Sequence, residues 1–160
     1  MNETQPPWYE TIVMPALLRH SRTTYGKAMR RALEEAGYDD MPRNGMYIVG
    51  GLALGANTVP LGQLVKELGV SKQAVGQLVD TLVLRGYLER KEDEEDRRKS
   101  NIVLTKRGRA AAAIQAEARG KIDAELISRA GQENVSRTRR TLAALINIGR
   151  EAAGEQDDEH

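Results

Sequence analysis

Residues 61–90 read LGQLVKELGVSKQAVGQLVDTLVLRGYLER, and this stretch decides the fold. Leu64 and Leu68 lie one helical turn apart, and a glycine then breaks the chain. Ser71 is a good N-cap for a second helical pattern, which ends before Gly86. Two short helices joined by a tight turn form a helix-turn-helix. The apolar side chains expected to face inward from the second helix are Val75, Leu78, Val79 and Leu82.

The outer face of this second helix carries candidate contacts for nucleic acid. Its side chains are slim and mostly polar, and amides of this kind read base edges in the major groove. The N-terminus of a helix is also a natural seat for phosphate. The alternative is an ordinary amphipathic helix with a solvated face, although such a face more often carries Glu and Lys pairs. The candidate DNA-binding residues of this helix are Ser71, Lys72, Gln73 and Gln77.

A hairpin with a highly charged loop follows the helix-turn-helix. Residues 87–90 and 101–104 have the composition of strands and bracket a loop at residues 91–100. A further short strand is expected at Thr58 and Val59, ahead of the two helices. A helix-turn-helix followed by such a hairpin is a winged helix. The expected fold class is therefore mainly α, a winged helix-turn-helix with long N- and C-terminal dimerisation helices.

The loop of this hairpin supplies a second set of candidate DNA contacts, Arg97, Arg98 and Lys99. Residues two apart in an extended segment point the same way, so we expect Asp96 to pair with Arg98 and to orient its guanidinium. An arginine held in this way suits the narrow minor groove. The alternative is a solvated turn, as for most charge runs, but the position after a helix-turn-helix favours DNA contact.

Apolar periodicity predicts two helices ahead of this lobe. The first begins near Pro15 and ends at Gly37. The second follows Asp40, which is expected to cap it, and its Gly50 and Gly51 suggest the close approach of another backbone. The expected inward side chains are Leu18, Tyr25, Met29 and Leu33 in the first helix, and Met46, Tyr47, Val49 and Leu52 in the second.

Two long helices are expected after the hairpin. The first is capped by Thr105 and ends at Gly131, and the second covers residues 133–152. A small winged-helix core cannot cover their apolar stripes, so we expect the terminal helices to pack against a second subunit in a homodimer. The inward side chains are Ala111, Ile114, Ala118, Ile122 and Leu126 in the first, and Val135, Leu142, Leu145 and Ile148 in the second.

The length of 160 residues suits a single domain. Pro- and charge-bearing ends without apolar periodicity are typical of disordered tails. The expected parts are dimerisation helices at residues 8–37 and 106–152, a winged-helix lobe at 41–105, and disordered tails at 1–7 and 154–160.

Composition argues against catalysis. The chain has no Cys, which excludes disulfides, thiolate nucleophiles, cysteine zinc sites and thiol redox sensors. Two His residues, one of them terminal, leave little for metal binding or acid–base chemistry. No carboxylate pair, triad or glycine loop has a catalytic spacing. We therefore expect a protein that is not an enzyme and that holds no cofactor and no metal.

Charge and hydropathy indicate the compartment and the partner class. The net charge is +1, and because the last ten residues carry five acidic groups, the first 150 carry +6. That is a mild preference for an anionic partner. The absence of an apolar signal core, of a membrane-spanning run and of Cys suggests a cytoplasmic protein without a membrane partner.

Residues 58–109 resemble the DNA-binding half of the multiple antibiotic resistance regulator (MarR) family of bacterial transcription factors. Besides the helix-turn-helix, the residues that carry the resemblance are Asp96, Arg98, Leu104, Thr105 and Gly108. The resemblance implies a dimeric regulator, most often a repressor, that binds double-stranded DNA with an inverted repeat. At Gly76 and Gln77 the chain departs from the family, which often has a hydroxyl residue and an arginine there.

The resemblance also implies that a small organic effector relieves DNA binding. Side chains between the first two helices and the lobe could line a pocket for an aromatic or amphipathic molecule, although core and interface packing is the alternative. The candidate pocket residues are Trp8, His20, Tyr25 and Tyr47.

An alternative function belongs to a different class. The chain could be a winged-helix architectural or protein-interaction module that binds DNA without sequence preference. The pair Gly76 and Gln77 and the modest net charge favour this alternative, because both reduce the cations available for specific contacts.

Overall fold

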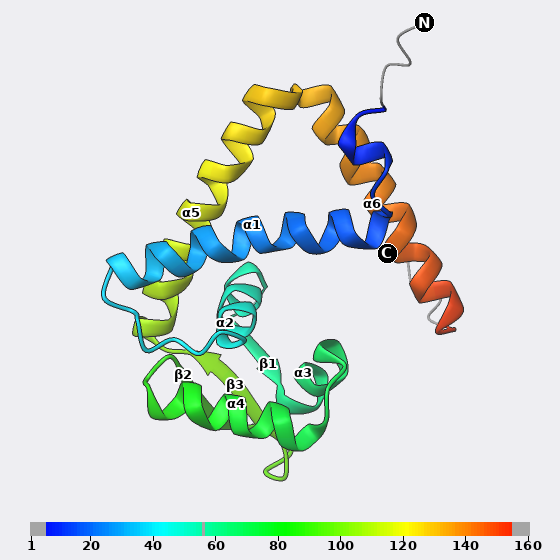
Figure 1. Cartoon of the computed structure of the whole chain (residues 1–160). Helices are drawn as coiled ribbons and strands as arrows, with labels where there is room; N and C mark the ends of the chain where they lie inside the picture. Colours follow the sequence, from blue (N-terminus) through cyan, green and yellow to red (C-terminus); the bar gives the residue numbers. More distant parts are fainter. Residues whose placement is uncertain (1–5, 56, 155–160) are drawn as a thin grey trace, which may run out of the picture. The chain divides into compact units, whose positions relative to one another are not determined.

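The computed structural model describes residues 6–55 and 57–154 (Figure 1). The chain divides into two compact units, residues 1–119 and 120–160, and the single-domain assignment stays a prediction. Most of the two tails expected to be disordered, residues 1–5 and 155–160, lies outside the described residues. Within the described ranges, every helix is too short or too polar to span a bilayer.

The order of elements confirms the predicted fold class, mainly α with a winged helix-turn-helix and long terminal helices. The elements are η1 (Trp8–Glu10), α1 (Met14–Glu35), α2 (Gly45–Leu54), β1 (Thr58–Pro60), α3 (Leu61–Leu68), α4 (Lys72–Leu84), β2 (Leu88–Glu92), β3 (Ser100–Leu104), α5 (Lys106–Ala130) and α6 (Gln132–Ala152).

The helix-turn-helix consists of α3 and α4. The turn places Gly69 at φ 61°, in the left-handed region that favours glycine. Ser71 caps α4 as predicted, because its hydroxyl accepts a hydrogen bond from the Ala74 N–H at 3.2 Å. Gly86 follows the end of α4 at φ 79°, so the predicted stop is also confirmed.

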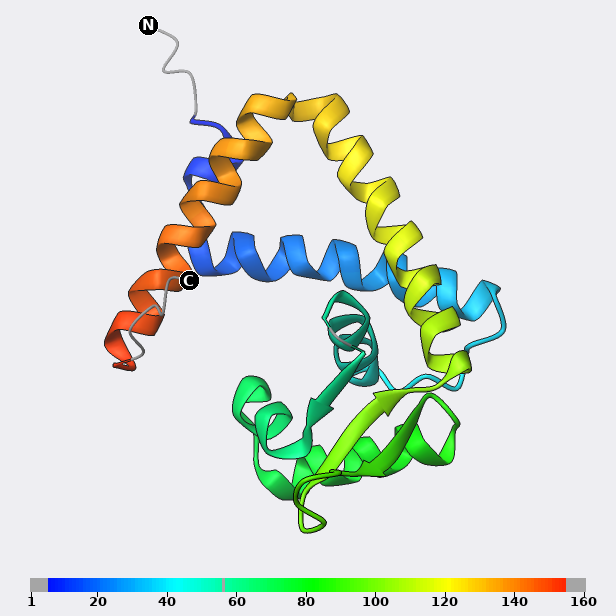
Figure 2. The ribbon, with the colours of Figure 1, turned by 180° about the vertical axis from the view of Figure 1, so that it is seen from behind.

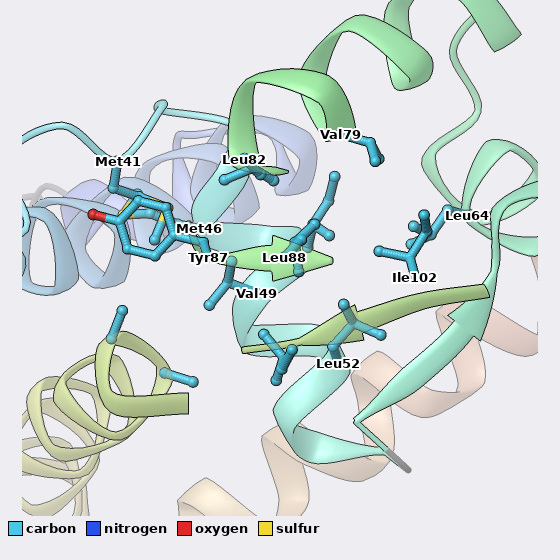
Figure 3. Close-up of a cluster of buried hydrophobic side chains, with 14 of the residues drawn as sticks. Met41, Met46, Val49, Leu52, Leu64, Val79, Leu82, Tyr87, Leu88 and Ile102 are labelled. Carbon is cyan, nitrogen blue, oxygen red and sulfur yellow. The ribbon is translucent and has the colours of Figure 1, made fainter. Parts of the chain in front are cut away.

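The core of the lobe lies between α4, α2 and the sheet. Val79 and Leu82 of α4 point toward Leu88 and Ile102 of the sheet (Figure 3), and all four side chains are at most 1% exposed. Burying one such side chain stabilises a fold by about 1.5 to 3 kcal/mol. The predicted apolar stripe of α4 therefore fixes which of its sides faces solvent.

The sheet has the order β1-β3-β2, and both pairs are antiparallel. The strand expected at Thr58 and Val59 is confirmed as β1. The hairpin strands are displaced from their predicted bounds, because Glu92 pairs with Ser100 and Tyr87 lies before β2. The loop is therefore shorter than predicted and covers residues 93–99.

Three details of α2 and its flanks differ from the expectation. Asp40 does not cap α2, because the N-cap of that helix is Asn44. The carboxylate of Asp40 instead accepts hydrogen bonds from the distant side chains of Tyr87 and Arg107. Tyr47 does not face the core, because Ile48 occupies the buried position next to it. The close approach at Gly50 comes from a side chain, since a Cβ there would lie 3.0 Å from Gln115 Oε1.

The start of α5 packs closely against the backbone at Tyr87, between α4 and β2. Thr105 caps α5 as predicted, because its Oγ1 accepts a hydrogen bond from the Gly108 N–H at 3.0 Å. The same hydroxyl donates to the Tyr87 carbonyl at 3.0 Å. A Cβ on Gly108 would lie 2.1 Å from that carbonyl oxygen, so only glycine allows this approach.

The unit at residues 120–160 contains the end of α5 and the whole of α6. Gly131 separates the two helices at φ 84°, as predicted. No residue of α6 is buried, and its apolar stripe includes Leu145 at 44% and Ile148 at 63% exposure. An apolar helix face of this kind is normally covered in the working form of a protein.

Candidate nucleic-acid interface

The exposed face of α4 and the loop of the hairpin lie at the end of the lobe away from α1, in both views of the molecule (Figures 1 and 2). We call residues 93–99 the wing loop. The hairpin and α4 pack on the same core. The side chains that they turn away from this core form two separate polar sets at this end of the lobe.

The candidate residues of α4 are all exposed. Lys72, Gln73 and Gln77 face solvent, and the stripe of Val75 and Val79 on the other side is fully buried. The Ser71 hydroxyl oxygen is occupied by the Ala74 N–H, which leaves its proton free to be donated. The side chains of Lys72, Gln73 and Gln77 make no hydrogen bond within residues 6–55 and 57–154. They are therefore available to a ligand of this face.

An ion pair joins α4 to the first strand of the hairpin. Arg90 donates to the carboxylate of Asp80, and the side chains of the two residues are 35% and 69% exposed. Asp80 is an acidic group on a face that would meet phosphate, and the guanidinium next to it offsets its charge. The sequence analysis did not identify Arg90, because its partner is ten residues away on another element.

The wing loop is a turn that one carboxylate organises. Asp93 Oδ1 accepts hydrogen bonds from the backbone N–H groups of Glu95 at 2.9 Å and Asp96 at 3.1 Å. The Asn101 amide donates to the other oxygen at 3.3 Å. The backbone bonds from Glu95 and Asp96 hold the pKa of the Asp93 carboxyl below its usual range. The sequence analysis did not identify Asp93, although an Asp whose side chain accepts a hydrogen bond from the backbone N–H two residues later is typical of turns.

The geometry expected for Asp96 differs from the observed one. The segment is a turn and not an extended strand, and the Asp96 carboxylate accepts from the backbone N–H of Arg98 at 3.0 Å. Asp96 thus fixes the main chain of Arg98, whereas the expected ion pair with its guanidinium is absent from the described residues. The reason is that, in a turn, the carboxylate of an Asp lies next to the backbone N–H of the residue two positions later, here Arg98.

The cations of the wing loop are exposed. Arg97 and Arg98 make no side-chain hydrogen bond or ion pair within the portion of the chain that the structure describes. The Lys99 carbonyl accepts a hydrogen bond from the Asp93 N–H at 3.1 Å, and the charge of the Lys99 side chain acts on the Asp93 carboxylate. The loop carries four carboxylates beside these three cations, but Asp93 and Asp96 are bonded to its backbone, and the cations follow one another at residues 97–99, where they can contact an anion together.

A second network braces the lobe behind this end. The Tyr87 hydroxyl donates to the Asp40 carboxylate, and Arg107 Nη2 donates to the same oxygen at 2.9 Å. The Arg107 guanidinium lies over the rings of Tyr38 and Tyr87, at 5.1 and 4.6 Å from their centroids. Burial, followed by the bond to Asp40, raises the pKa of Tyr87 to about 12. The bond from Tyr87 lowers the pKa of Asp40.

The four candidate pocket residues do not come together in either of the two described hollows, and the pocket stays a prediction. Tyr47 lines two described hollows, one against α1 and one against α3. Trp8 is 68% exposed on η1, His20 is exposed on α1, and Tyr25 packs partly against the core. Trp8, His20 and Tyr25 line neither of these two hollows.

The comparison with known proteins concerns the same segment. A sequence profile described as the MarR family matches residues 40–99, which contain α2, the helix-turn-helix and most of the hairpin. No curated protein matches the chain significantly.

Solved structures extend the comparison over most of the chain. The chain is similar to FabT from Streptococcus pneumoniae in complex with DNA, with 22% identity and a TM-score of 0.74, over 87% of this chain and 96% of that one. It is also similar to wild-type MarR (apo form) from E. coli, with 21% identity and a TM-score of 0.62, over 84% and 96%. A mutant MarR from E. coli complexed with operator DNA gives 20% identity and a TM-score of 0.66, over 85% and 95%. At these identities the similarity shows the fold.

Proposed function

The chain belongs to the MarR family through its winged-helix segment, residues 40–99, and we propose that it is a homodimeric transcriptional repressor whose operator binding a small organic effector relieves. The observation that carries the proposal is that α4 and the wing loop lie at one end of the lobe (Figures 1 and 2), where α4 has exposed polar side chains and the wing loop has exposed cations. Two similar proteins, FabT and a mutant MarR, were solved with DNA, which supports DNA as the partner. A regulator of this kind is not an enzyme.

The proposed division of labour follows from the side chains. α4 enters the major groove, where Gln73 and Gln77 read base edges and Ser71 and Lys72 contact phosphate at the helix N-terminus. The wing loop lies over the adjacent minor groove, where Arg98 is the inserted cation and Arg97 and Lys99 contact the backbone. Contacts of both kinds are needed, because phosphate contacts position the protein and base contacts specify the sequence.

The proposed dimer explains the uncovered helix. No residue of α6 is buried within its own unit, and a second copy of the chain would bury its apolar stripe. The expected mass in solution is that of two chains at micromolar concentration. Replacing Leu145 and Ile148 with Glu should give single chains, whereas Asn147→Glu, on the opposite side of α6, should not. A single-chain mass for the wild type contradicts the dimer.

A two-fold dimer binds a two-fold site. The two α4 helices should enter successive major grooves, with half-site centres roughly 34 to 36 Å apart. Selection of bound fragments from the source genome, followed by footprinting, tests this directly. The expected footprint covers an inverted repeat, and protection of one half-site alone contradicts the proposal.

Effector relief is the part of the proposal that concerns regulation. Hollows border Tyr47 on both sides, so a ligand there would contact α2, which packs in the core of the DNA-binding lobe. The absence of Cys and the scarcity of His argue against peroxide and zinc as direct signals. Loss of DNA binding on adding stoichiometric zinc, reversed by a chelator, would contradict this part.

A further inference from the structure

A hollow of about 290 Å³ between α1 and the start of α2 has an unusual lining. Five cations and one aromatic ring border it: Arg19, Arg22, Lys27, Arg30, Arg43 and Tyr47. No carboxylate is among its lining residues. A second hollow, of about 360 Å³ between α2 and α3, has no cation in its lining and one carboxylate, that of Glu67. Of the two hollows that the structure describes, only the first has a cationic lining.

The cations of this hollow are not used in ion pairs. Within residues 6–55 and 57–154, the side chains of Arg19, Lys27 and Arg43 have no hydrogen bond or ion pair. By contrast, Arg31, which belongs to α1 but does not line the hollow, pairs with Glu35 at 2.8 Å. Like charges three residues apart on a helix repel each other, as in the pair Lys27 and Arg30. An anion in the hollow would relieve this repulsion.

Part of the lining is already held in place for such a ligand. The Arg22 guanidinium lies over the Tyr47 ring, 4.4 Å from its centroid. Arg30 Nη1 donates to the Met41 carbonyl at 2.6 Å. Two guanidiniums with reduced freedom lose less entropy when they bind an anion.

We propose that this hollow binds a small organic molecule carrying two or more negative charges, such as a phosphate ester or a polycarboxylate. The ligand needs at least two negative charges because five cations and no carboxylate line the hollow. A ligand with one negative charge would leave most of the repulsion between these cations in place. The hollow is small by the standards of ligand pockets, which limits the ligand to a small molecule. That this polyanion is the effector rests on the proposed function, whereas its binding does not.

A bound polyanion would connect α1 to the start of α2. Lys27 and Arg22 belong to α1, and Arg43 lies just before α2, whose Ile48 and Val49 are in the core of the lobe. A ligand that draws Arg43 toward α1 therefore acts on the element that supports α4. It relieves DNA binding only if it binds the DNA-free arrangement more tightly.

The binding test uses the full chain without DNA and calorimetry at constant ionic strength. The probes are citrate and inorganic pyrophosphate, with benzoate as the singly charged comparison. We expect one citrate or pyrophosphate per chain and at least tenfold weaker binding of benzoate. Equal affinity for benzoate, or no binding of either multiply charged probe, overturns the proposal.

Matched variants assign the binding to the hollow. Lys27→Gln and Arg43→Gln should each weaken citrate binding about tenfold or more while leaving the melting temperature of the free chain unchanged, because neither side chain bonds to the described residues. Arg31→Gln removes the same charge from a residue of α1 that does not line the hollow, and it should leave citrate affinity within twofold. An equal loss in all three variants would mean that citrate responds only to the net charge, which overturns the site.

The regulatory part is tested on the complex with DNA. Citrate should release the selected DNA from the wild type and fail to do so from Arg43→Gln at the same concentration. Citrate binding without DNA release overturns the effector role. If the chain without citrate has no affinity for DNA, the proposed function is contradicted. The calorimetric result then still decides whether the anion site exists.

Discussion

α4 and the wing loop present neighbouring polar surfaces, but they are held in place by different interactions. α4 is held by apolar burial, with Val75, Val79 and Leu82 fully buried. The wing loop has no buried side chain, and the carboxylates of Asp93 and Asp96 hold its backbone through hydrogen bonds. Because surface hydrogen bonds contribute less to stability than buried apolar groups, the two regions respond differently to substitution.

This difference separates folding from DNA binding. Changes at the buried side chains of α4 should reduce the stability of the lobe and affect DNA binding only through unfolding, whereas changes on its exposed face should act on DNA binding. Changes in the wing loop should leave the melting temperature unchanged and act on DNA binding alone. Each prediction below states whether its substitution should change the stability of the fold or the binding of DNA.

The largest effect is expected inside α4. Leu82→Ala should destabilise the fold by about 2 to 5 kcal/mol, because the side chain is fully buried and the cavity cannot fully close. Leu84→Ala, two residues later and 87% exposed, should change stability by less than about 0.5 kcal/mol. Urea denaturation measures both. Similar values for the two variants would contradict the assigned orientation of α4.

The next effect is expected in the wing loop. Arg98→Ala should weaken operator binding by about 1 to 3 kcal/mol and flatten the preference at flanking A·T positions, with an unchanged melting temperature. Asp96→Ala should cause a smaller loss of the same kind, since the guanidinium remains but its backbone is released. Quantitative DNA titration measures both. If both variants bind like the wild type, the wing loop is only a solvated turn.

A pH-dependent effect is expected at the brace behind α4. Tyr87 has a pKa raised to about 12, above the unfolded value of about 10, so the stability that it contributes is complete below pH 10. That stability is lost as the pH rises through 12. Tyr87→Phe should destabilise the fold by about 1 kcal/mol at neutral pH and lose less stability between pH 10 and 12. Chemical denaturation across this range measures the difference, and parallel curves for the two proteins would contradict it.

The smallest effect is expected at the N-terminus of α4. Lys72→Ala should weaken binding to all sequences alike and lower the slope of log affinity against log salt by about 0.9, because one phosphate contact is lost. Gln77→Ala should leave that slope unchanged and alter which bases are preferred. Titrations at several salt concentrations distinguish them. A changed slope in Gln77→Ala would mean that its amide does not act through base edges.

Local patterns predicted the helix-turn-helix well. The glycine break after α3 and the caps at Ser71 and Thr105 depend on neighbours within a few residues, and helical spacing gives α4 its buried side. The stop signals Gly37, Gly86 and Gly131 are equally local, and each has a positive φ. These features depend on propensities that a single stretch of sequence contains.

Contacts between distant segments were not predictable in the same way. Asp40 has the residue type of a helix cap, but Tyr87 and Arg107, 47 and 67 positions away, compete successfully for its carboxylate. Asp96 was expected in an extended segment, whereas the bonds made by Asp93 turn the loop. The cationic lining near Tyr47 combines α1 with Arg43, a pairing that no periodic pattern indicates.

The most direct test of the central claim is the ratio of affinities for the selected operator and for a scrambled sequence of equal length and composition, measured at physiological salt. A regulator that reads bases with α4 and the wing loop should prefer the operator by about a thousandfold or more. The ratio should fall in Gln77→Ala and in Arg98→Ala. A ratio close to one in the wild type would contradict sequence-specific regulation and support an architectural module that binds DNA without sequence preference.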